Sequence, residues 1–154
     1  MGKMTDNYEI RNPTNFVAGT VGGPGERIFY LQAVGDGSVL TLKLEKGQVQ
    51  SLASHLLQII EDEANDIAAA PVTNMIEPPN AVWTVGALAI ALSEEPSEIV
   101  VVAQELPDQD EVEPSEAHIY ISFSQAKAFV DHALFLMEYG RDFGRQNGHK
   151  RIGE

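Results

Sequence analysis

Four residues carry the side chains with which this sequence could bind or transform a ligand. Arg27 closes a glycine-rich run, residues 19–27, and its guanidinium could hold an anion beside a tight turn. His55 and His132 could ligate a metal or share a proton, and Trp83 could line a pocket. The candidate ligand-binding residues are therefore Arg27, His55, Trp83 and His132.

Each of these candidates also has a structural interpretation. The glycine-rich run lacks the Lys-Ser/Thr ending of a P-loop and lies between two expected strands, so a tight hairpin accounts for it. Both histidines fall at the edge of an apolar helical stripe, where a half-buried imidazole commonly packs and hydrogen-bonds. Trp83, together with Phe29 and Tyr30, is better explained by core packing.

The motifs of common enzymes and metal sites are missing from the sequence. With no cysteine, the chain has no disulfide, thiolate nucleophile or cysteine-based zinc site. It also contains no H-E-x-x-H or G-x-S-x-G pattern. The acids between Glu61 and Asp66 lack the order of an EF-hand loop and are interpreted as a solvated helix end. We therefore predict no catalytic residues, no metal and no cofactor.

The charge balance limits the partners. Ten Lys and Arg stand against 23 Asp and Glu, a formal net charge of −13. Such a chain repels phosphate backbones, which argues against nucleic acid and anionic membranes. The longest apolar stretch, Ala81–Leu92, is about half of what a membrane-spanning helix needs. A cytoplasmic protein is expected, with a protein partner or a homo-oligomer left open.

An internal repeat organises the chain. Thr20-Val21-Gly22 returns as Thr84-Val85-Gly86, and residues 42–60 align without a gap on residues 119–137. In this alignment Gln48 meets Gln125 and His55 meets His132. A unit used twice commonly packs about a pseudo-two-fold axis.

Hydrophobic periodicity predicts three strands and a helix in each unit. The strands alternate apolar and polar residues, most cleanly over Val39–Leu44, whereas residues 45–66 and 125–139 show helical stripes. Gly140 is expected to end the second helix. The predicted fold is α+β, with two βββα repeats forming a roughly six-stranded antiparallel sheet, both helices on one side and pseudo-two-fold symmetry.

The domain boundaries follow from composition. Residues 1–14 are polar and are expected to form a flexible leader. A single α+β domain is predicted over residues 15–140, with repeat one at 15–66 and repeat two at 81–140. Residues 141–154 are glycine-rich and basic, which is typical of a flexible tail.

The phrase Phe16–Ala33, FVAGTVGGPGERIFYLQA, resembles the opening of a family of uncharacterised proteins best known from actinobacteria. The resemblance continues through Leu44–Val49, Trp83–Gly86, the acidic segment Pro107–Glu116 and Phe123–Phe129. It spans about residues 15–141. Family members typically end in a Cys-rich segment resembling a zinc site, which this sequence lacks. The family has no assigned function, although its genes tend to lie near a phosphatase-like gene and a lipid-kinase-like gene.

Two functions remain open at this stage. The absence of a catalytic constellation favours a non-enzymatic binding or assembly module. The alternative is a small-ligand-binding protein or enzyme with a site between the two repeats, which takes an anionic or phosphorylated ligand. A pocket in which Arg27, His55, Trp83 and His132 converge would favour that alternative.

Overall fold

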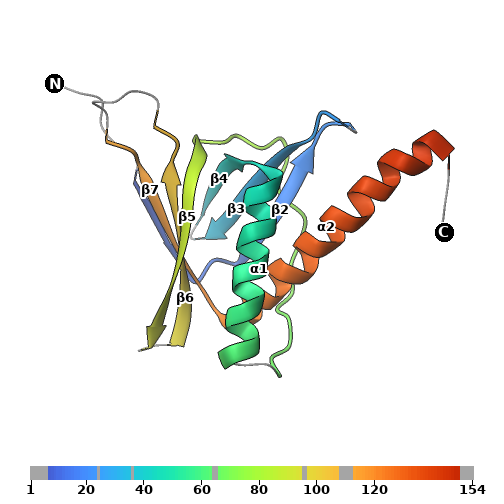
Figure 1. Ribbon diagram of the computed structural model, residues 1–154. Coiled ribbons are helices and arrows are strands. Elements are labelled where there is room, and N and C mark those ends of the chain that lie inside the picture. Colours follow the sequence, from blue (N-terminus) through green and yellow to red (C-terminus); the bar gives the residue numbers. More distant parts are fainter. Residues whose placement is uncertain are drawn as a thin grey trace.

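The computed structural model describes residues 7–23, 25–35, 37–63, 66–94, 97–107 and 113–149, with side chains up to Met137 apart from that of Glu94. Its strands and helices are shown in Figure 1. They are β1 (Tyr8–Arg11), β2 (Asn15–Val21), β3 (Ile28–Gly35), β4 (Ser38–Leu44), α1 (Lys46–Glu63), β5 (Trp83–Glu94), β6 (Ser97–Glu105), β7 (Glu116–Ile121) and α2 (Phe123–His149).

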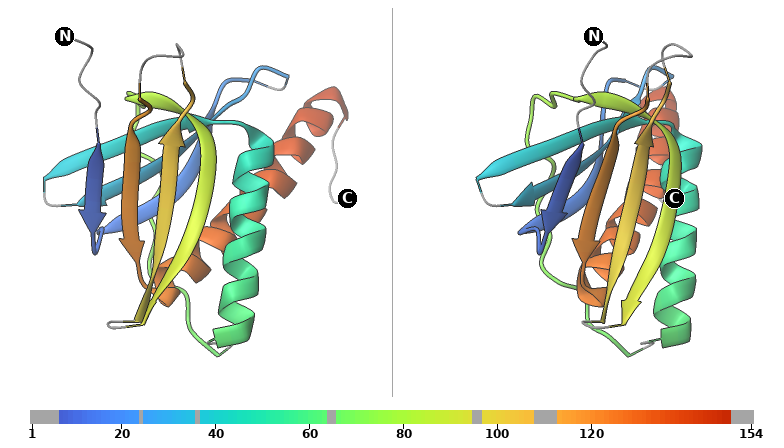
Figure 2. Two further views of the ribbon diagram at one scale, coloured as in Figure 1. Left: turned by 60° about the vertical axis from the view of Figure 1, so that its left-hand side comes forward. Right: turned by 90° about the vertical axis from the view of Figure 1, so that its left-hand side faces the viewer.

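One mixed sheet contains all of these strands, in the order β1-β7-β6-β5-β4-β3-β2. Most neighbours are antiparallel, but β1 runs parallel to β7 and β4 runs parallel to β5. The β4–β5 junction is short, with only Leu42 opposite Trp83 and Lys43 opposite Thr84. Figure 2 shows that the strands of the two halves run at a large angle to each other, so the sheet is strongly bent.

The α+β class is confirmed, but the sheet differs from the six-stranded antiparallel one that the repeat predicts. The seventh strand is β1, which lies inside the segment expected to be a flexible leader. Ile10 packs against the core, and the Asn12 N–H donates to the Tyr120 carbonyl at 3.2 Å. Residues 8–11 are therefore ordered because they bury apolar surface and satisfy the edge of β7.

After β1, the order of three strands and a helix occurs twice. Leu44 and Ile121 end β4 and β7, and in each unit the helix begins two residues later. The predicted repeats are nevertheless not matched exactly. A two-fold axis perpendicular to the sheet would pair equivalent strands, whereas here the third strand of one unit pairs with the first strand of the next. The units are joined head to tail.

Equivalent glutamines cap the two helices. The Glu45 N–H donates to Gln48 Oε1 at 2.7 Å, and the Ser122 N–H donates to Gln125 Oε1 at 3.1 Å. Both contacts satisfy a backbone donor at a helix start, as in a capping box. Gln48 Nε2 also donates to the Val85 carbonyl at 3.2 Å, which ties α1 to β5.

Both helices pack on the same face of the sheet. Leu52 and Leu56 of α1 and Phe129 of α2 are buried in one core, and the rings of Phe16 and Phe129 lie 4.9 Å apart. The sheet residues of this core alternate along each strand, which explains the period-two pattern of the sequence. They are Phe16, Ala18, Phe29, Leu31, Ala33, Leu40, Leu42, Leu44, Trp83, Val85, Ile99, Val101, Ala103, Ala117, Ile119 and Ile121.

Residues 67–82, which we call the strap, cover the opposite face of β2, β3 and β4. Gln32 accepts the Ile76 N–H at 2.8 Å and donates to the Ile76 carbonyl at 3.2 Å. Asn15 makes the same pair of bonds with Thr73, each at 3.0 Å. The three prolines of Ala68–Asn80, at positions 71, 78 and 79, predict that this segment breaks the helix and links the two halves. The structure shows in addition that it packs as a layer on the sheet.

The second helix is longer than its sequence predicts. Gly140 does not end it, because α2 continues to His149. A glycine inside a helix costs about 1 kcal/mol relative to alanine and does not by itself stop the helix. The helix end predicted at Gly140 is therefore wrong. Residues 150–154 of the predicted tail lie outside the described residues.

Candidate functional site

The clearest polar cavity lies where the β2–β3 turn meets the start of α1. It has a volume of about 420 Å³. We call it the Arg27 cavity. It is lined by Gly25, Arg27, Ile28, Phe29, Lys43, Leu44, Glu45 and Lys46. Cavities of this size accommodate a small ligand.

The local sequence builds this cavity through a tight turn and a hairpin. Gly22 has a φ of 109°, and a Cβ there would lie 2.5 Å from the Glu26 carbonyl oxygen, so the turn needs glycine. Phe29 pairs with Leu44 in the β3–β4 ladder. This pair ends the ladder, so Arg27, two residues before Phe29, and Lys46, two residues after Leu44, both lie at this end of the hairpin and line the cavity.

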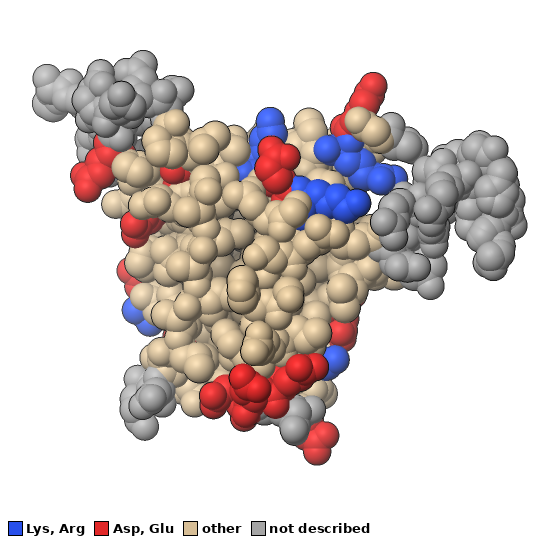
Figure 3. All heavy atoms as spheres, viewed as in Figure 1, with Lys and Arg blue, Asp and Glu red and all other residues tan. Residues whose placement is uncertain are grey.

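The cavity is positively charged on a negatively charged protein. Arg27, Lys43 and Lys46 contribute three positive charges against the single carboxylate of Glu45. The first turn of α1 contains no acidic residue, and its amino end adds further positive potential. Figure 3 shows basic side chains gathered near the top of the molecule with some acidic ones beside them, a group of acidic side chains at the bottom and a largely uncharged face between. This potential suits an anionic group.

The structure does not bring the four sequence candidates into one site. Arg27 lines the cavity just described, whereas Trp83 is a core residue with 8% of its surface exposed. His55 is exposed and lines a separate cleft between α1 and β5. His132 lies on α2 beside Phe135, with ring centroids 6.4 Å apart. The predicted site between the repeats is therefore divided among several places.

Two further hollows adjoin the helices. The cleft between α1 and β5, which we call the β5–α1 cleft, has a volume of about 460 Å³. Its lining residues are Ser51, Leu52, His55, Gln58, Ile59, Asp62, Leu88, Ala89 and Ile90. A smaller apolar groove of about 310 Å³ lies between α1 and α2, lined on the α2 side by Val130, Ala133, Leu134 and Met137.

His132 on α2 is partly buried. Partial burial lowers its pKa from the ordinary histidine value, because desolvation disfavours the imidazolium. His55, at the equivalent position on α1, is exposed. Equivalent positions in the repeat thus give the two histidines different environments.

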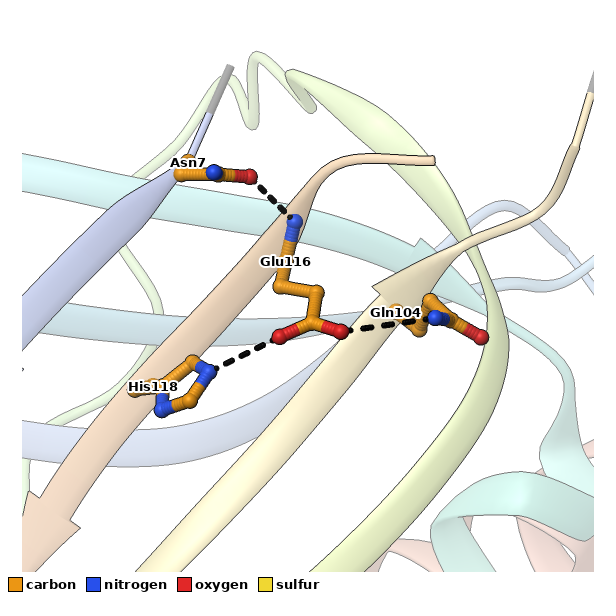
Figure 4. A network of polar contacts seen from close by, with 4 residues as sticks. All are labelled: Asn7, Gln104, Glu116 and His118. Atoms are coloured by element: carbon orange, nitrogen blue, oxygen red, sulfur yellow. Dashed lines mark hydrogen bonds and ion pairs between the residues drawn. The ribbon is translucent and has the colours of Figure 1, made fainter. Parts of the chain in front are cut away.

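A polar network joins β1, β6 and β7 on the sheet face away from the helices (Figure 4). Glu116 contacts His118 Nε2 at 3.0 Å and accepts from Gln104 Nε2 at 3.4 Å, while its own N–H donates to Asn7 at 2.8 Å. The carboxylate can orient the imidazole through this contact. Since Asn7 directly precedes β1, the network also fastens that edge strand to the sheet.

Metal ligation finds little support in the part of the chain that the structure describes. Among those residues, no group of three or more His, Cys, Asp or Glu side chains lies close enough to hold an ion. Nor is any helix there long and apolar enough to cross a membrane.

Sequence reasoning identified Arg27 but missed Lys43 and Lys46. Lys43 is the polar residue between Leu42 and Leu44 in the cleanest alternating strand, and this pattern by itself indicates only a solvent-facing side chain. The sequence signal that could have found them is Gly35-Asp36-Gly37, which is typical of a tight hairpin turn. Such a turn predicts the register that pairs Phe29 with Leu44, and it therefore brings Arg27 to the end of the hairpin where Lys46 follows.

Comparison with known proteins gives one match. The model of a family described as "Protein of unknown function (DUF3090)" matches residues 8–145. No curated protein and no solved structure matches the chain.

Proposed function

Because the chain belongs to this family of unknown function, we propose its role from the geometry: it is a non-enzymatic binding module whose Arg27 cavity receives an anionic group of its ligand. One observation carries the proposal. Three of the ten Lys and Arg residues of a chain with net charge −13 line one cavity, although its overall field repels anions.

The lining favours binding over catalysis. The cavity offers a guanidinium, two ammonium groups and the amino end of α1, which together can hold a phosphate or carboxylate by charge and hydrogen bonds. Its carboxylate, Glu45, belongs to the helix cap, where its backbone N–H is bonded to Gln48. These groups attract and orient an anion and need no chemical step.

The specificity of the cavity follows from its donors. Arg27 presents a planar fork that matches two oxygens of a phosphate or carboxylate, whereas Lys43 and Lys46 act as point charges. Phe29 and Leu44 add apolar wall beside these charges. A small ligand with an anionic group and an apolar portion fits this combination best.

Titration with inorganic pyrophosphate, followed by backbone amide NMR, tests the proposal. The expected shifts lie in residues 25–29 and 43–47. Arg27→Gln should weaken binding about tenfold or more, because a hydrogen bond to a charged group is worth about 1.5–3 kcal/mol.

Lys127→Gln is the matched control. It removes the same charge from α2, where Lys127 pairs with Asp131 at 3.3 Å. If Arg27→Gln and Lys127→Gln weakened pyrophosphate binding equally, the loss of binding would follow from the net charge of the protein and not from the Arg27 cavity. That result, or no binding at about 10 mM pyrophosphate, would refute the proposal.

A further inference from the structure

The strand β5 has an open edge in the middle of the sheet order. Its pairing with β6 continues from Val85 to Glu94, whereas its pairing with β4 ends at Thr84. After Leu44, β4 gives way to Glu45 and then to α1, so the chain leaves β5 at that point. Among the described residues, no strand pairs with this edge of β5 beyond Thr84.

An open edge of this length offers backbone hydrogen bonds to another strand. In an antiparallel ladder, alternate residues direct their N–H and C=O groups toward the partner, and the residues between them direct theirs to the other side. About half of residues 86–94 therefore present backbone groups away from β6. Such edges are the sites at which an extended peptide adds to a sheet.

The β5–α1 cleft lies directly beside this edge. Leu88, Ala89 and Ile90 all line it, although successive residues of a strand point to opposite faces. A cavity that touches all three must reach the backbone edge of β5. The cleft, with a volume of about 460 Å³, therefore lies between the unpaired backbone groups of β5 and the side of α1, and it could accommodate an added strand.

The walls of the cleft specify the side chains that an added strand would need. Leu52 and Ile59 of α1 face Leu88 and Ile90 of β5 across the cleft, which suits an apolar residue. Ser51, His55 and Gln58 form a polar rim, which suits the alternating polar residues.

Charge complementarity selects a basic segment. Asp62 lines the cleft, and the exposed Glu61 and Glu63 adjoin it at the end of α1. Figure 3 shows a group of acidic side chains at the lower end of this face, the end at which α1 finishes in Figure 1. The net charge of −13 also disfavours a second copy of this chain as the occupant.

We infer that the open edge of β5 and the β5–α1 cleft bind an extended segment of another protein, with alternating apolar residues and a Lys or Arg placed against Asp62. This surface is distinct from the Arg27 cavity and does not depend on the function proposed for it.

A panel of capped seven-residue peptides tests the inference on the full chain. The peptides alternate Val, Leu or Phe with Thr and Lys, and acidic counterparts carry Glu in place of Lys. Backbone amide NMR should show shifts and slowed hydrogen exchange in residues 86–92 with the basic peptides. Peptides methylated on the backbone nitrogens of one edge should bind at least tenfold more weakly, because they keep their side chains but lose the strand pairing.

Two variants test the charge argument. Asp62→Asn should weaken the basic peptides about two- to fivefold, as for an exposed ion pair. Glu61→Gln removes the same charge from a residue that does not line the cleft, and it should have a smaller effect.

Four outcomes would overturn the inference. One is the absence of binding by every peptide at about 1 mM. Another is equal binding of the methylated peptides, or shifts that lie outside β5 and α1. The last is slowed exchange in residues 86–92 that rises with protein concentration alone, since a second copy would then occupy the edge.

Discussion

Replacing Gln32 by alanine should release the strap from the sheet. Gln32 is 1% exposed and makes three contacts: with Thr41 Oγ1 at 3.1 Å, and with the backbone N–H and carbonyl of Ile76. A hydrogen bond contributes about 1 kcal/mol net, so the three together are worth about 3 kcal/mol. Ile76 is half exposed and water can reach its backbone, so the expected loss is about 2–3 kcal/mol.

Urea denaturation followed by far-UV circular dichroism measures this loss. With a slope of about 2 kcal/mol per molar urea, the midpoint should fall by about 1–1.5 M. Hydrogen exchange adds a local readout, because the Ile76 N–H donates to Gln32. Its exchange should accelerate more than that of core amides such as Leu42.

Gln104→Ala is the control for this experiment. Gln104 is also a strand glutamine, but it is only partly buried, and its one contact with Glu116 is long at 3.4 Å. Its replacement should change stability by less than about 0.5 kcal/mol. If Gln32→Ala costs no more than this control, the strap is not held by Gln32 and the reasoning fails.

Two further predictions concern close packing and pH. Gly86→Ala should lower the free energy of unfolding by about 1–3 kcal/mol in the same urea assay, because the new Cβ would lie 2.8 Å from the Leu106 Cα. Gly23→Ala is the control, because a Cβ there meets open space, and it should be near neutral. Equal costs for the two variants would refute the packing argument. Burial lowers the pKa of His132 in the folded protein below its value in the unfolded chain. As pH falls, the unfolded chain therefore takes up a proton at His132 before the folded protein does. The stability that His132 contributes above its unfolded pKa should accordingly be lost as pH falls through its folded pKa. His132→Gln should flatten the fall in the urea midpoint below about pH 6.5. His55→Gln, at the exposed equivalent position, is the control and should not flatten this fall in the urea midpoint. If His55→Gln flattened the fall and His132→Gln did not, the role given to His132 would be contradicted.

Local sequence patterns determined most of the secondary structure. Alternation along β3, β4 and β7 and the stripes of the two helices follow from which face each element buries, so they can be recognised in the local sequence. The repeat also aligned Gln48 with Gln125, and both cap a helix, but the stripes predicted helix starts at residues 45 and 125, whereas the helices begin at Lys46 and Phe123.

Long-range pairing decided the rest of the fold. Tyr8–Arg11 shows too short a pattern to predict a strand, and it becomes β1 only because the edge of β7 is available to it. The parallel β4–β5 junction likewise depends on how the strap crosses the sheet, which neither strand's sequence specifies. The strap itself looked like a linker, since its bonds to Gln32 and Asn15 join residues 44 and 58 positions apart.

The candidate sites divide in the same way. The sequence determined that Arg27 follows a glycine-rich turn, but only the β3–β4 register and the start of α1 placed Lys43 and Lys46 around the same cavity. Likewise, β5 was recognisable as a strand, while its open edge exists because β4 stops pairing at Thr84. A residue's own preferences set its local conformation, whereas convergence in space depends on partners distant in the chain, and that information lies only in the tertiary structure.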